Sequence, residues 1–346
     1  MVLIGCDFHP SWQQVSWLEV ETGETGDHKL VHEVGAVDKF YRRFPAGSRI
    51  GMEATGNCQW FIESVNRLGH ELWVGDAAKI RASDDRQQKH DQRDARLLLR
   101  LLVEKRFPRI WMPSREEKDL RQLLIHRYKL VRIRAQVKNG LQHLALNQGL
   151  QKKRRLWSKA GQQALCELPL ASWASRRRED LLKLMSELDA KTDLLDQAVV
   201  EAAEKNEKAK LLMTQPGVGP ITALAFVLTM GDVARFPRGK QVASYLGLIP
   251  REYSSGGHQR LGSISKQGSS FLRMLLVEAA QMAVRCDAGF RKEYLYRCHT
   301  KAKGVAKVAA ARKLAIRLYW MLRTMTQYPE IVRSESSSRV PLVSES

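Results

Sequence analysis

The sequence has no apolar run long enough to cross a bilayer, which argues against a membrane-spanning protein. Its longest such run, Ile221 to Met230, is far shorter than the roughly 20 residues that a transmembrane helix requires. No signal peptide is expected ahead of the first predicted strand. We therefore predict a soluble, cytosolic protein without a membrane partner.

Cysteine is scarce and scattered. The five cysteines are odd in number and form no Cys-x-x-Cys pair, the spacing that many structural zinc sites and redox motifs use. Unpaired, dispersed cysteines are typical of reduced thiols in a reducing compartment. The sequence thus predicts neither a disulfide framework nor a structural zinc.

Acidic residues are also in short supply. Asp and Glu number 37 against 57 Lys and Arg, a net charge of +20 over 346 residues. An excess of this size favours a polyanionic partner, with nucleic acid as the first candidate and a membrane surface as the alternative. The hydrophobic content of 44% indicates a folded chain with two or three domains.

Apolar runs in the first 112 residues predict a set of strands, and two of these strands end at an acid. Strands are expected over residues 2–6, 12–20, 29–34, 49–52 and 71–74, with helices over 37–44 and up to Leu68. Asp7 follows the first strand and Glu53 the fourth. Since ligands of open sheets bind beyond the carboxyl ends of strands, these two acids could share a pocket.

Two further acids, Asp91 and Asp94, precede a leucine-rich helix predicted over residues 96–103. Their spacing of three places both on one helical face. Four carboxylates in one pocket would repel one another without a cation, and ligation by oxygen alone suits Mg²⁺ or Mn²⁺. The alternative is that each acid is a solvated loop residue or a helix cap.

Long helices are predicted over residues 115–147 and 179–205, because apolar residues recur there at heptad spacing. Arg127 and Arg134 interrupt the seam of the first helix. The pattern predicts a coiled-coil hairpin or a dimer arm. A basic stretch with Trp157 lies between the helices and is either a nucleic-acid contact or a solvated tip; its candidate residues are Lys152, Lys153, Arg154 and Arg155.

The segment around Gly217 and Gly219 has the helix-hairpin-helix pattern, in which backbone N–H groups hold a phosphate without reading bases. A tight turn between core helices is the alternative. Further helices are predicted over 271–284 and 301–321. Arg273, Arg312 and Lys313 lie on them and would either contact nucleic acid or face solvent. The tail after Tyr328 is predicted to be disordered.

The stretch from Pro250 to Gly268 combines adjacent serines with several glycines and Lys266. Glycine lets the backbone approach a ligand closely, and successive N–H groups in such turns can bind an anion. This composition suits attack on a phosphodiester by a hydroxyl group. An ordinary surface loop has the same composition.

Together these motifs resemble the DEDD-type insertion-sequence transposases, the "one-ten" family of bridge-RNA-guided recombinases. The resemblance extends from Val2 to about Met325. Its motifs are Asp7, Glu53-Ala54-Thr55-Gly56, Lys89-x-Asp91-x-x-Asp94-Ala95, Pro216-Gly217-Val218-Gly219, Gly247-Leu248-x-Pro250, Ser255-Gly256 and Ile264-Ser265-Lys266-x-Gly268.

The resemblance implies an α/β plus α protein. Its expected parts are an RNase H-like (RuvC-like) domain at 1–112, a coiled-coil arm at 113–208, a mostly helical transposase domain at 209–328, and a disordered tail at 329–346. By position, Asp7, Glu53, Asp91 and Asp94 match the metal-binding catalytic acids of the family. Ser255 matches its nucleophile, and the adjacent Ser254 offers a second hydroxyl.

The function implied is recombination of donor and target DNA, directed by a bridge RNA, through a phosphoserine intermediate. The family also implies a homo-oligomer, a dimer assembling to a tetramer, in which the pocket is completed between protomers. Two other hypotheses fit the residues. One is a metal-dependent Holliday-junction endonuclease whose serine stretch only holds phosphate, and the other is a non-catalytic architectural protein.

Overall fold

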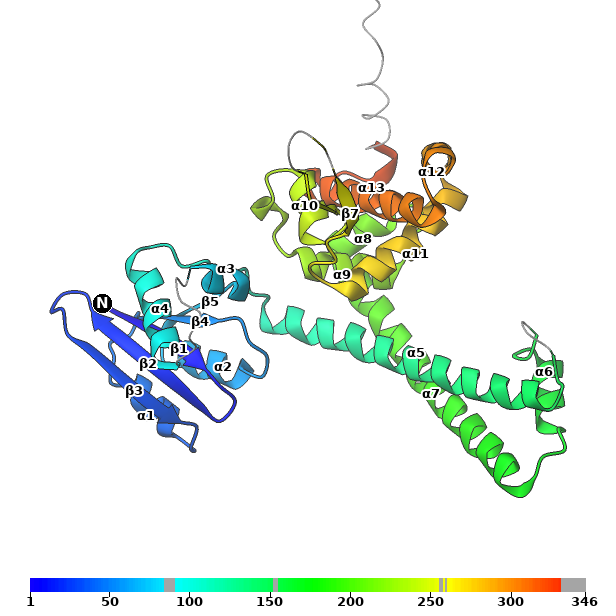
Figure 1. The fold of residues 1–346 in the computed structure, drawn as a ribbon, viewed down its shortest axis with the longest axis horizontal. Coiled ribbons are helices and arrows are strands. Elements are labelled where there is room, and N and C mark those ends of the chain that lie inside the picture. Colours follow the sequence, from blue (N-terminus) through cyan, green and yellow to red (C-terminus); the bar gives the residue numbers. More distant parts are fainter. Residues whose placement is uncertain (84–90, 152–154, 255–257, 259, 331–346) are drawn as a thin grey trace, which may run out of the picture. The chain divides into compact units, whose positions relative to one another are not determined.

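The computed structural model describes residues 1–83, 91–151, 155–254, 258 and 260–330, and Figure 1 gives their path. The chain divides into two compact units, Met1–Met112 and Pro113–Ser346. Within the described ranges, no helix combines the length and the apolar character that membrane crossing requires. The predicted arm and transposase domain fall in one unit, so the boundary near residue 208 stays a prediction. Most of the predicted tail lies outside the described residues.

A five-stranded mixed sheet forms the centre of the first unit, with strand order β3-β2-β1-β4-β5. The strands β1 to β3 form an antiparallel meander, and β1, β4 and β5 run parallel. The strands are β1 (Val2–Phe8), β2 (Trp12–Glu19), β3 (Thr25–Val31), β4 (Arg49–Glu53) and β5 (Glu71–Gly75).

Helices cover both faces of this sheet, because the side chains of β1 alternate between two apolar clusters. Ile4 and Cys6 join the cluster beneath α1 (Ala36–Tyr41) and α2 (Gln59–Arg67). Leu3 joins the cluster beneath α4 (Asp91–Val103). The short helix α3 (Ala77–Ala82) follows β5 and adds Ile80 to the α4 side. The first unit is therefore a mixed α/β domain.

Two 33-residue helices, α5 (Arg115–Asn147) and α7 (Ser172–Glu204), pack against each other in the second unit. Arg127 pairs with Asp196, and Arg134 Nη1 lies 2.8 Å from Asp189 Oδ1. The two helices are antiparallel, because the later residue on α5, Arg134, pairs with the earlier residue on α7, Asp189. The two arginines that interrupt the predicted apolar seam are thus the residues that fix the register of the pair. The short helix α6 (Lys159–Cys166) lies in the connection.

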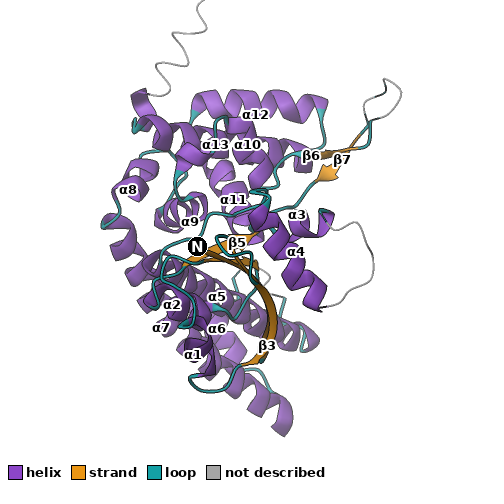
Figure 2. Ribbon diagram, turned by 90° about the vertical axis from the view of Figure 1, so that its left-hand side faces the viewer, coloured by secondary structure: helices purple, strands orange, loops and turns teal. Residues whose placement is uncertain are grey.

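The rest of the second unit is a helical domain built around α9 (Pro220–Met230), which is buried on almost every side (Figure 2). A small hairpin, β6 (Pro250–Glu252) and β7 (Leu261–Ile264), is its only sheet among the described residues. Its other helices are α8 (Glu207–Met213), η1 (Val233–Arg235), α10 (Gly239–Tyr245), α11 (Ser270–Cys286), α12 (Ala288–Thr300) and α13 (Lys303–Thr324).

The last described segment is attached to this domain by polar contacts. The Tyr328 hydroxyl donates to Asp287 Oδ2 at 2.7 Å, and the Tyr328 N–H donates to Thr214 Oγ1 at 3.1 Å. Arg317 contacts the same carboxylate at 3.2 Å, and the exposed fractions of the Arg317 and Asp287 side chains are 5% and 9%. The buried carboxylate therefore joins the start of α12 to α13 and to Tyr328, and Tyr328 in turn contacts the end of α8.

Several predicted boundaries were wrong. The third strand, predicted over 29–34, spans Thr25–Val31, because pairing with β2 across the hairpin sets its register. The second arm helix, predicted from 179, begins at Ser172. The helices α3, α6 and α12 were not predicted.

Candidate active site

Asp7 and Glu53 lie at the carboxyl ends of neighbouring parallel strands. The last paired residues of β1 and β4 are Cys6 and Met52, so Asp7 and Glu53 are the next residues in register. Cys6 and Met52 face the α1 and α2 side of the sheet, so Asp7 and Glu53 face the α4 side, since side chains on a strand alternate in direction. The two predicted strand-end acids therefore lie on the same face and at the same edge of the sheet.

The close approach of α4 to β1 positions the other two acids. A Cβ atom at Gly5 would lie 2.1 Å from the Ala95 carbonyl oxygen and 2.6 Å from the Leu99 nitrogen. Only a glycine permits such a contact between strand and helix backbones. Asp91 and Asp94 occupy the first turn of α4, one turn before this contact, and are thereby brought to the strand end that bears Asp7.

Asp7, His9 and Asp91 form a cluster that could hold a metal ion. Their ligand atoms all lie within 4.8 Å of one another. His9 Nε2 is 3.2 Å from Asp7 Oδ2 and 4.0 Å from Asp91 Oδ1. The exposed fractions of the Asp7 and Asp91 side chains are 17% and 44%, so the cluster opens toward solvent on the side of α4.

The electrostatics of Asp7 reflect this setting. Burial raises the pKa of Asp7, and the nearby charges of Asp94 and Asp91 raise it further, while His9 opposes the shift. A carboxylate that is destabilised by burial and by like charges gains from a bound cation. The site therefore has the charge and the donor atoms that a divalent cation requires.

Glu53 is placed differently from the other three acids. Its carboxylate oxygen Oε1 lies 3.7 Å from Arg81 Nη2, on α3. Among the described residues the metal-competent cluster does not include it. The structure thus groups Asp7 with Asp91 and places Asp94 close enough for its charge to act on Asp7, with Glu53 on the adjacent strand end in an ion pair.

The predicted nucleophile Ser255 lies outside the described residues, but its neighbour Ser254 does not. The Ser254 hydroxyl donates to Glu252 Oε1 at 2.7 Å and accepts the Arg260 N–H at 3.1 Å. The Tyr253 N–H also donates to the Arg260 carbonyl at 2.9 Å. The hydroxyl of Ser254 therefore closes the hairpin that carries the serine stretch.

The hairpin is anchored to α10 by contacts between backbones. A Cβ at Gly247 would lie 2.3 Å from the Gln267 carbonyl oxygen, and one at Gly268 would lie 2.3 Å from the Tyr245 carbonyl oxygen. Both glycines have positive φ, 64° and 67°. Arg273 Nη1 donates to the carbonyl oxygens of Leu246, at 3.2 Å, and Gln267. The guanidinium predicted to reach a phosphate instead ties together the two ends of the hairpin.

The two glycines of the predicted phosphate-binding hairpin before α9 have different surroundings. Gly217 has φ 87°, and a Cβ there would lie 2.5 Å from the Ala283 nitrogen, so this residue packs against α11. Gly219 is the N-cap of α9 and has open space around its Cβ position. The tight-turn alternative thus accounts for Gly217, while Gly219 stays a candidate for phosphate contact.

The predicted basic contacts differ in how their charge is used. Lys313 forms an ion pair with Glu293, whereas Arg155 and Lys266 are exposed and Arg312 is partly exposed. Lys152, Lys153 and Arg154 lie outside the described residues. Three exposed lysines lie around the start of α13: Lys301 precedes the helix, and Lys303 and Lys307 lie in its first turns. None of the three takes part in an ion pair within the described chain.

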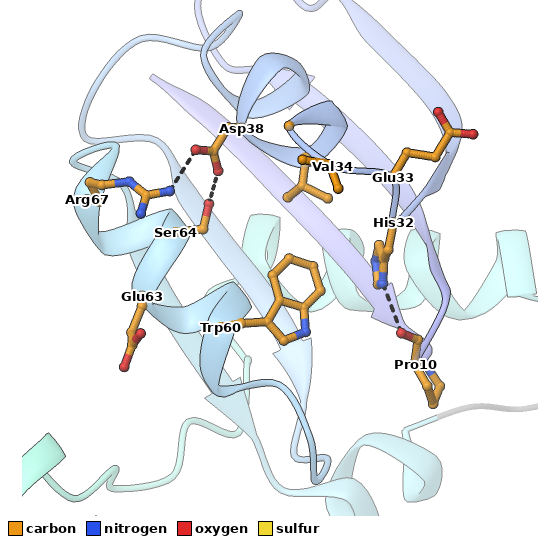
Figure 3. Close-up of a pocket in the computed structure, with 11 residues that line it drawn as sticks. Pro10, His32, Glu33, Val34, Asp38, Trp60, Glu63, Ser64 and Arg67 are labelled. Atoms are coloured by element: carbon orange, nitrogen blue, oxygen red, sulfur yellow. Dashed lines mark hydrogen bonds and ion pairs between the residues drawn. The ribbon is translucent and has the colours of Figure 1, made fainter.

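A groove of about 620 Å³ lies on the other face of the first unit (Figure 3). It is lined by residues of α1, α2 and the loop after β3. Asp38 accepts hydrogen bonds from Ser64 and, at 2.6 Å, from Arg67, and His32 lies 3.2 Å from the Pro10 carbonyl oxygen. Because α1 and α2 cover the face opposite α4, this groove is separate from the acidic cluster.

The sequence of this chain is similar to those of known proteins. Residues 209–295 match the profile described as "Transposase IS116/IS110/IS902 family", and residues 4–148 match the DEDD profile described as "Transposase". A "Probable family 20 transposase" of Pseudomonas aeruginosa is 30% identical over 299 residues, covering 83% of this chain and 86% of the relative. The chain belongs to the IS110/IS116/IS902 family of insertion-sequence transposases.

Other relatives of this transposase agree with that assignment. The "Transposase for insertion sequence element IS1111A" of Coxiella burnetii is 30% identical over 209 residues, covering 58% of this chain and 56% of the relative. The "Pilin gene-inverting protein" of Moraxella bovis is 26% identical over 283 residues, covering 79% of each chain. The predicted resemblance is confirmed, and as a transposase the protein is an enzyme that acts on DNA.

His9 of this transposase was not predicted as a site residue. The residue lies two positions after Asp7, in the turn between β1 and β2, and its ring stacks on Trp12 with centroids 4.1 Å apart. A histidine close behind a strand-end acid was the available signal. Only the placement of α4 shows that its imidazole also faces Asp91.

Proposed function

We propose that this transposase cuts and rejoins donor and target DNA through a covalent phosphoserine intermediate, directed by a bridge RNA. The observation that carries the proposal is the convergence of strand-end and helix-start acids at one edge of the sheet. The strand order β3-β2-β1-β4-β5 supports an RNase H-like (RuvC-like) fold for the first unit. The antiparallel arm helices support the coiled-coil assignment.

Asp7, Glu53, Asp91 and Asp94 are the proposed ligands of Mg²⁺ or Mn²⁺. Oxygen donors suit either ion, and the raised pKa of Asp7 supports a role for a cation. A bound divalent ion supplies Lewis-acid stabilisation to the oxygens of the scissile phosphate. Glu53 must exchange its ion pair with Arg81 to take part, which a rotation of either exposed side chain accomplishes.

Ser255 is the proposed nucleophile. Its Oγ attacks phosphorus, the Oγ–P bond forms as the bond from phosphorus to the 3′ oxygen breaks, and the hydroxyl proton is transferred to the departing oxygen. The products are a phosphoserine linkage and a free 3′ hydroxyl. The linkage keeps the energy of the broken bond, so the reverse attack rejoins strands without another energy source. The hydrogen bonds of Ser254 support its neighbour as the reactive residue.

The acids and the serine belong to different units, which supports a pocket completed between protomers of a homo-oligomer, a dimer or tetramer. Sequence recognition is assigned to base pairing with the guide RNA, so the protein itself contacts backbone and shape. The exposed lysines around the start of α13, with Arg155, Arg312, Lys266 and the N-cap Gly219, support such contacts in the cytosol or nucleoid.

Trapping on denaturing gels tests the proposal. Labelled DNA incubated with protein and guide RNA is expected to give a covalent adduct with wild type and, in reduced yield, with Ser254→Ala. No adduct is expected with Ser255→Ala, although its DNA binding persists. Asp7→Asn is expected to bind DNA without cutting it. If Ser255→Ala still cut DNA, the protein would be a metal-dependent endonuclease and the serine intermediate would be refuted.

The three lysines around the start of α13 have a separate test. Replacing Lys301, Lys303 and Lys307 by Gln is expected to weaken binding of all DNA sequences alike. It should also reduce the slope of log affinity against log salt by up to about 3, because each phosphate contact contributes about 0.9. An unchanged slope would remove these lysines from the proposed interface.

A further inference from the structure

His9 is held rigidly beside the acids by groups other than the acids. Its ring is stacked on Trp12 at an interplanar angle of 23°. The His9 N–H also donates to the Trp12 carbonyl oxygen at 2.9 Å, which closes the turn between β1 and β2. The imidazole is therefore oriented by the fold of the turn, and its Nε2 faces the acids.

The spacing around Nε2 fits a shared ion. Two atoms that bind the same ion through bonds of about 2.0 to 2.2 Å can lie no more than about 4.4 Å apart. The separations from His9 Nε2 to Asp7 Oδ2 and Asp91 Oδ1, 3.2 and 4.0 Å, are both within this limit. The two carboxylate oxygens lie within 4.8 Å of each other, so a small rotation of the exposed Asp91 side chain brings all three atoms onto one ion without a rearrangement of the backbone.

We propose that His9 is a nitrogen ligand of the divalent ion, so that the site selects Mn²⁺ over Mg²⁺. Imidazole suits first-row transition metals, whereas Mg²⁺ strongly prefers oxygen donors. The inference rests on the proposed function in one respect, that the acids hold a metal. A histidine that only oriented Asp7 by a hydrogen bond would leave the metal with oxygen donors alone.

Electron spin resonance of full-length protein titrated with Mn²⁺ distinguishes these roles, because it detects bound ion without DNA or turnover. Wild type is expected to show electron-spin-echo modulation from a ¹⁴N nucleus. It should also bind Mn²⁺ at least about tenfold more tightly than Mg²⁺ in competition. His9→Gln is expected to lose the nitrogen modulation and about 10- to 100-fold in Mn²⁺ affinity, the range that follows loss of groups supporting a metal site.

Two further variants keep the test decisive if His9→Gln disturbs the turn. His9→Asp provides an oxygen ligand at the same place, so Mn²⁺ binding should return without nitrogen modulation and with the preference over Mg²⁺ reduced. His143→Gln, on the exposed side of α5 in the other unit, is the matched control and should behave as wild type.

The outcomes separate this inference from the proposed function. If wild type lacked nitrogen modulation while Asp7→Asn abolished Mn²⁺ binding, the acids would hold the metal and the role of His9 would be refuted. If Asp7→Asn bound Mn²⁺ as wild type does, the acidic site itself would be refuted. Nitrogen modulation that persisted in His9→Gln would assign the nitrogen to another residue and overturn the inference.

Discussion

Gly5→Ala tests the idea that a backbone contact positions the catalytic acids. The added methyl group would lie 2.1 Å from the Ala95 carbonyl oxygen and 2.6 Å from the Leu99 nitrogen. These are backbone atoms, so no side chain can rotate away to relieve the overlap. A normal contact requires α4 to move from β1 by about 1 Å. Overpacking of this kind costs about 1 to 3 kcal/mol in the free energy of unfolding.

The same shift moves Asp91 and Asp94 away from Asp7. A displacement of about 1 Å at a catalytic site can lower the rate about 100-fold. Chemical denaturation would measure the loss of stability, calorimetry with Mn²⁺ the loss of metal affinity, and adduct formation on labelled DNA the loss of activity. We expect all three to fall in Gly5→Ala.

Gly51→Ala is the matched comparison. Gly51 pairs with Gly5 across β1 and β4, and its added methyl group would meet only the side chains of Phe107 and Leu102, at 2.7 and 3.0 Å. These side chains can adjust, so a smaller loss of stability and little loss of metal affinity are expected. The reasoning is refuted if Gly5→Ala binds Mn²⁺ with wild-type affinity, or if the two variants affect the site equally.

Three further predictions concern stability. Asp287→Asn removes the buried carboxylate charge that faces the buried Arg317 and should lower the free energy of unfolding by about 3 to 5 kcal/mol; a loss below about 1 kcal/mol in denaturant titration would contradict this. Hydrogen bonding to Arg96 lowers the pKa of Asp27, so its contribution is complete above the ordinary Asp pKa and is lost as the pH falls through the folded pKa. Asp27→Asn should therefore flatten the decline of stability below about pH 4, and an unchanged acid limb would exclude the pair. Gly217→Ala combines a positive φ with a backbone overlap and should cost more than about 1 kcal/mol; Gly304→Ala, which has open space, serves as control and should cost nothing.

The regular elements of the first unit were largely predictable because apolar runs end where its parallel strands end. Asp7 and Glu53 could be placed at strand ends from the sequence for this reason. That the two acids share one face of the sheet could not be predicted, since it depends on the register between β1 and β4. The close packing of α4 on β1 could not be predicted either, because nothing in the sequence around Gly5 indicates that a helix packs against it.

Other features depended on partners distant in the sequence. Arg127 and Arg134 looked like defects in an apolar seam, and only the antiparallel packing of α7 shows that aspartates face them. Arg273 and Lys313 looked available for phosphate, but their partners lie in other elements. His9 was overlooked because its relation to Asp91 is set by the sheet and not by spacing. Charged residues were thus easy to find and hard to assign.

The contacts of Tyr328 with Asp287 and Thr214 have a practical consequence for handling the protein. They hold the chain after α13 against the helical domain, since Tyr328 bonds to residues next to α8 and α12. Shortened proteins that stop at the end of α13 would lose both hydrogen bonds and would expose the Asp287 carboxylate, which is normally covered. Affinity tags and fusion partners therefore belong beyond Glu330, where they leave these bonds in place.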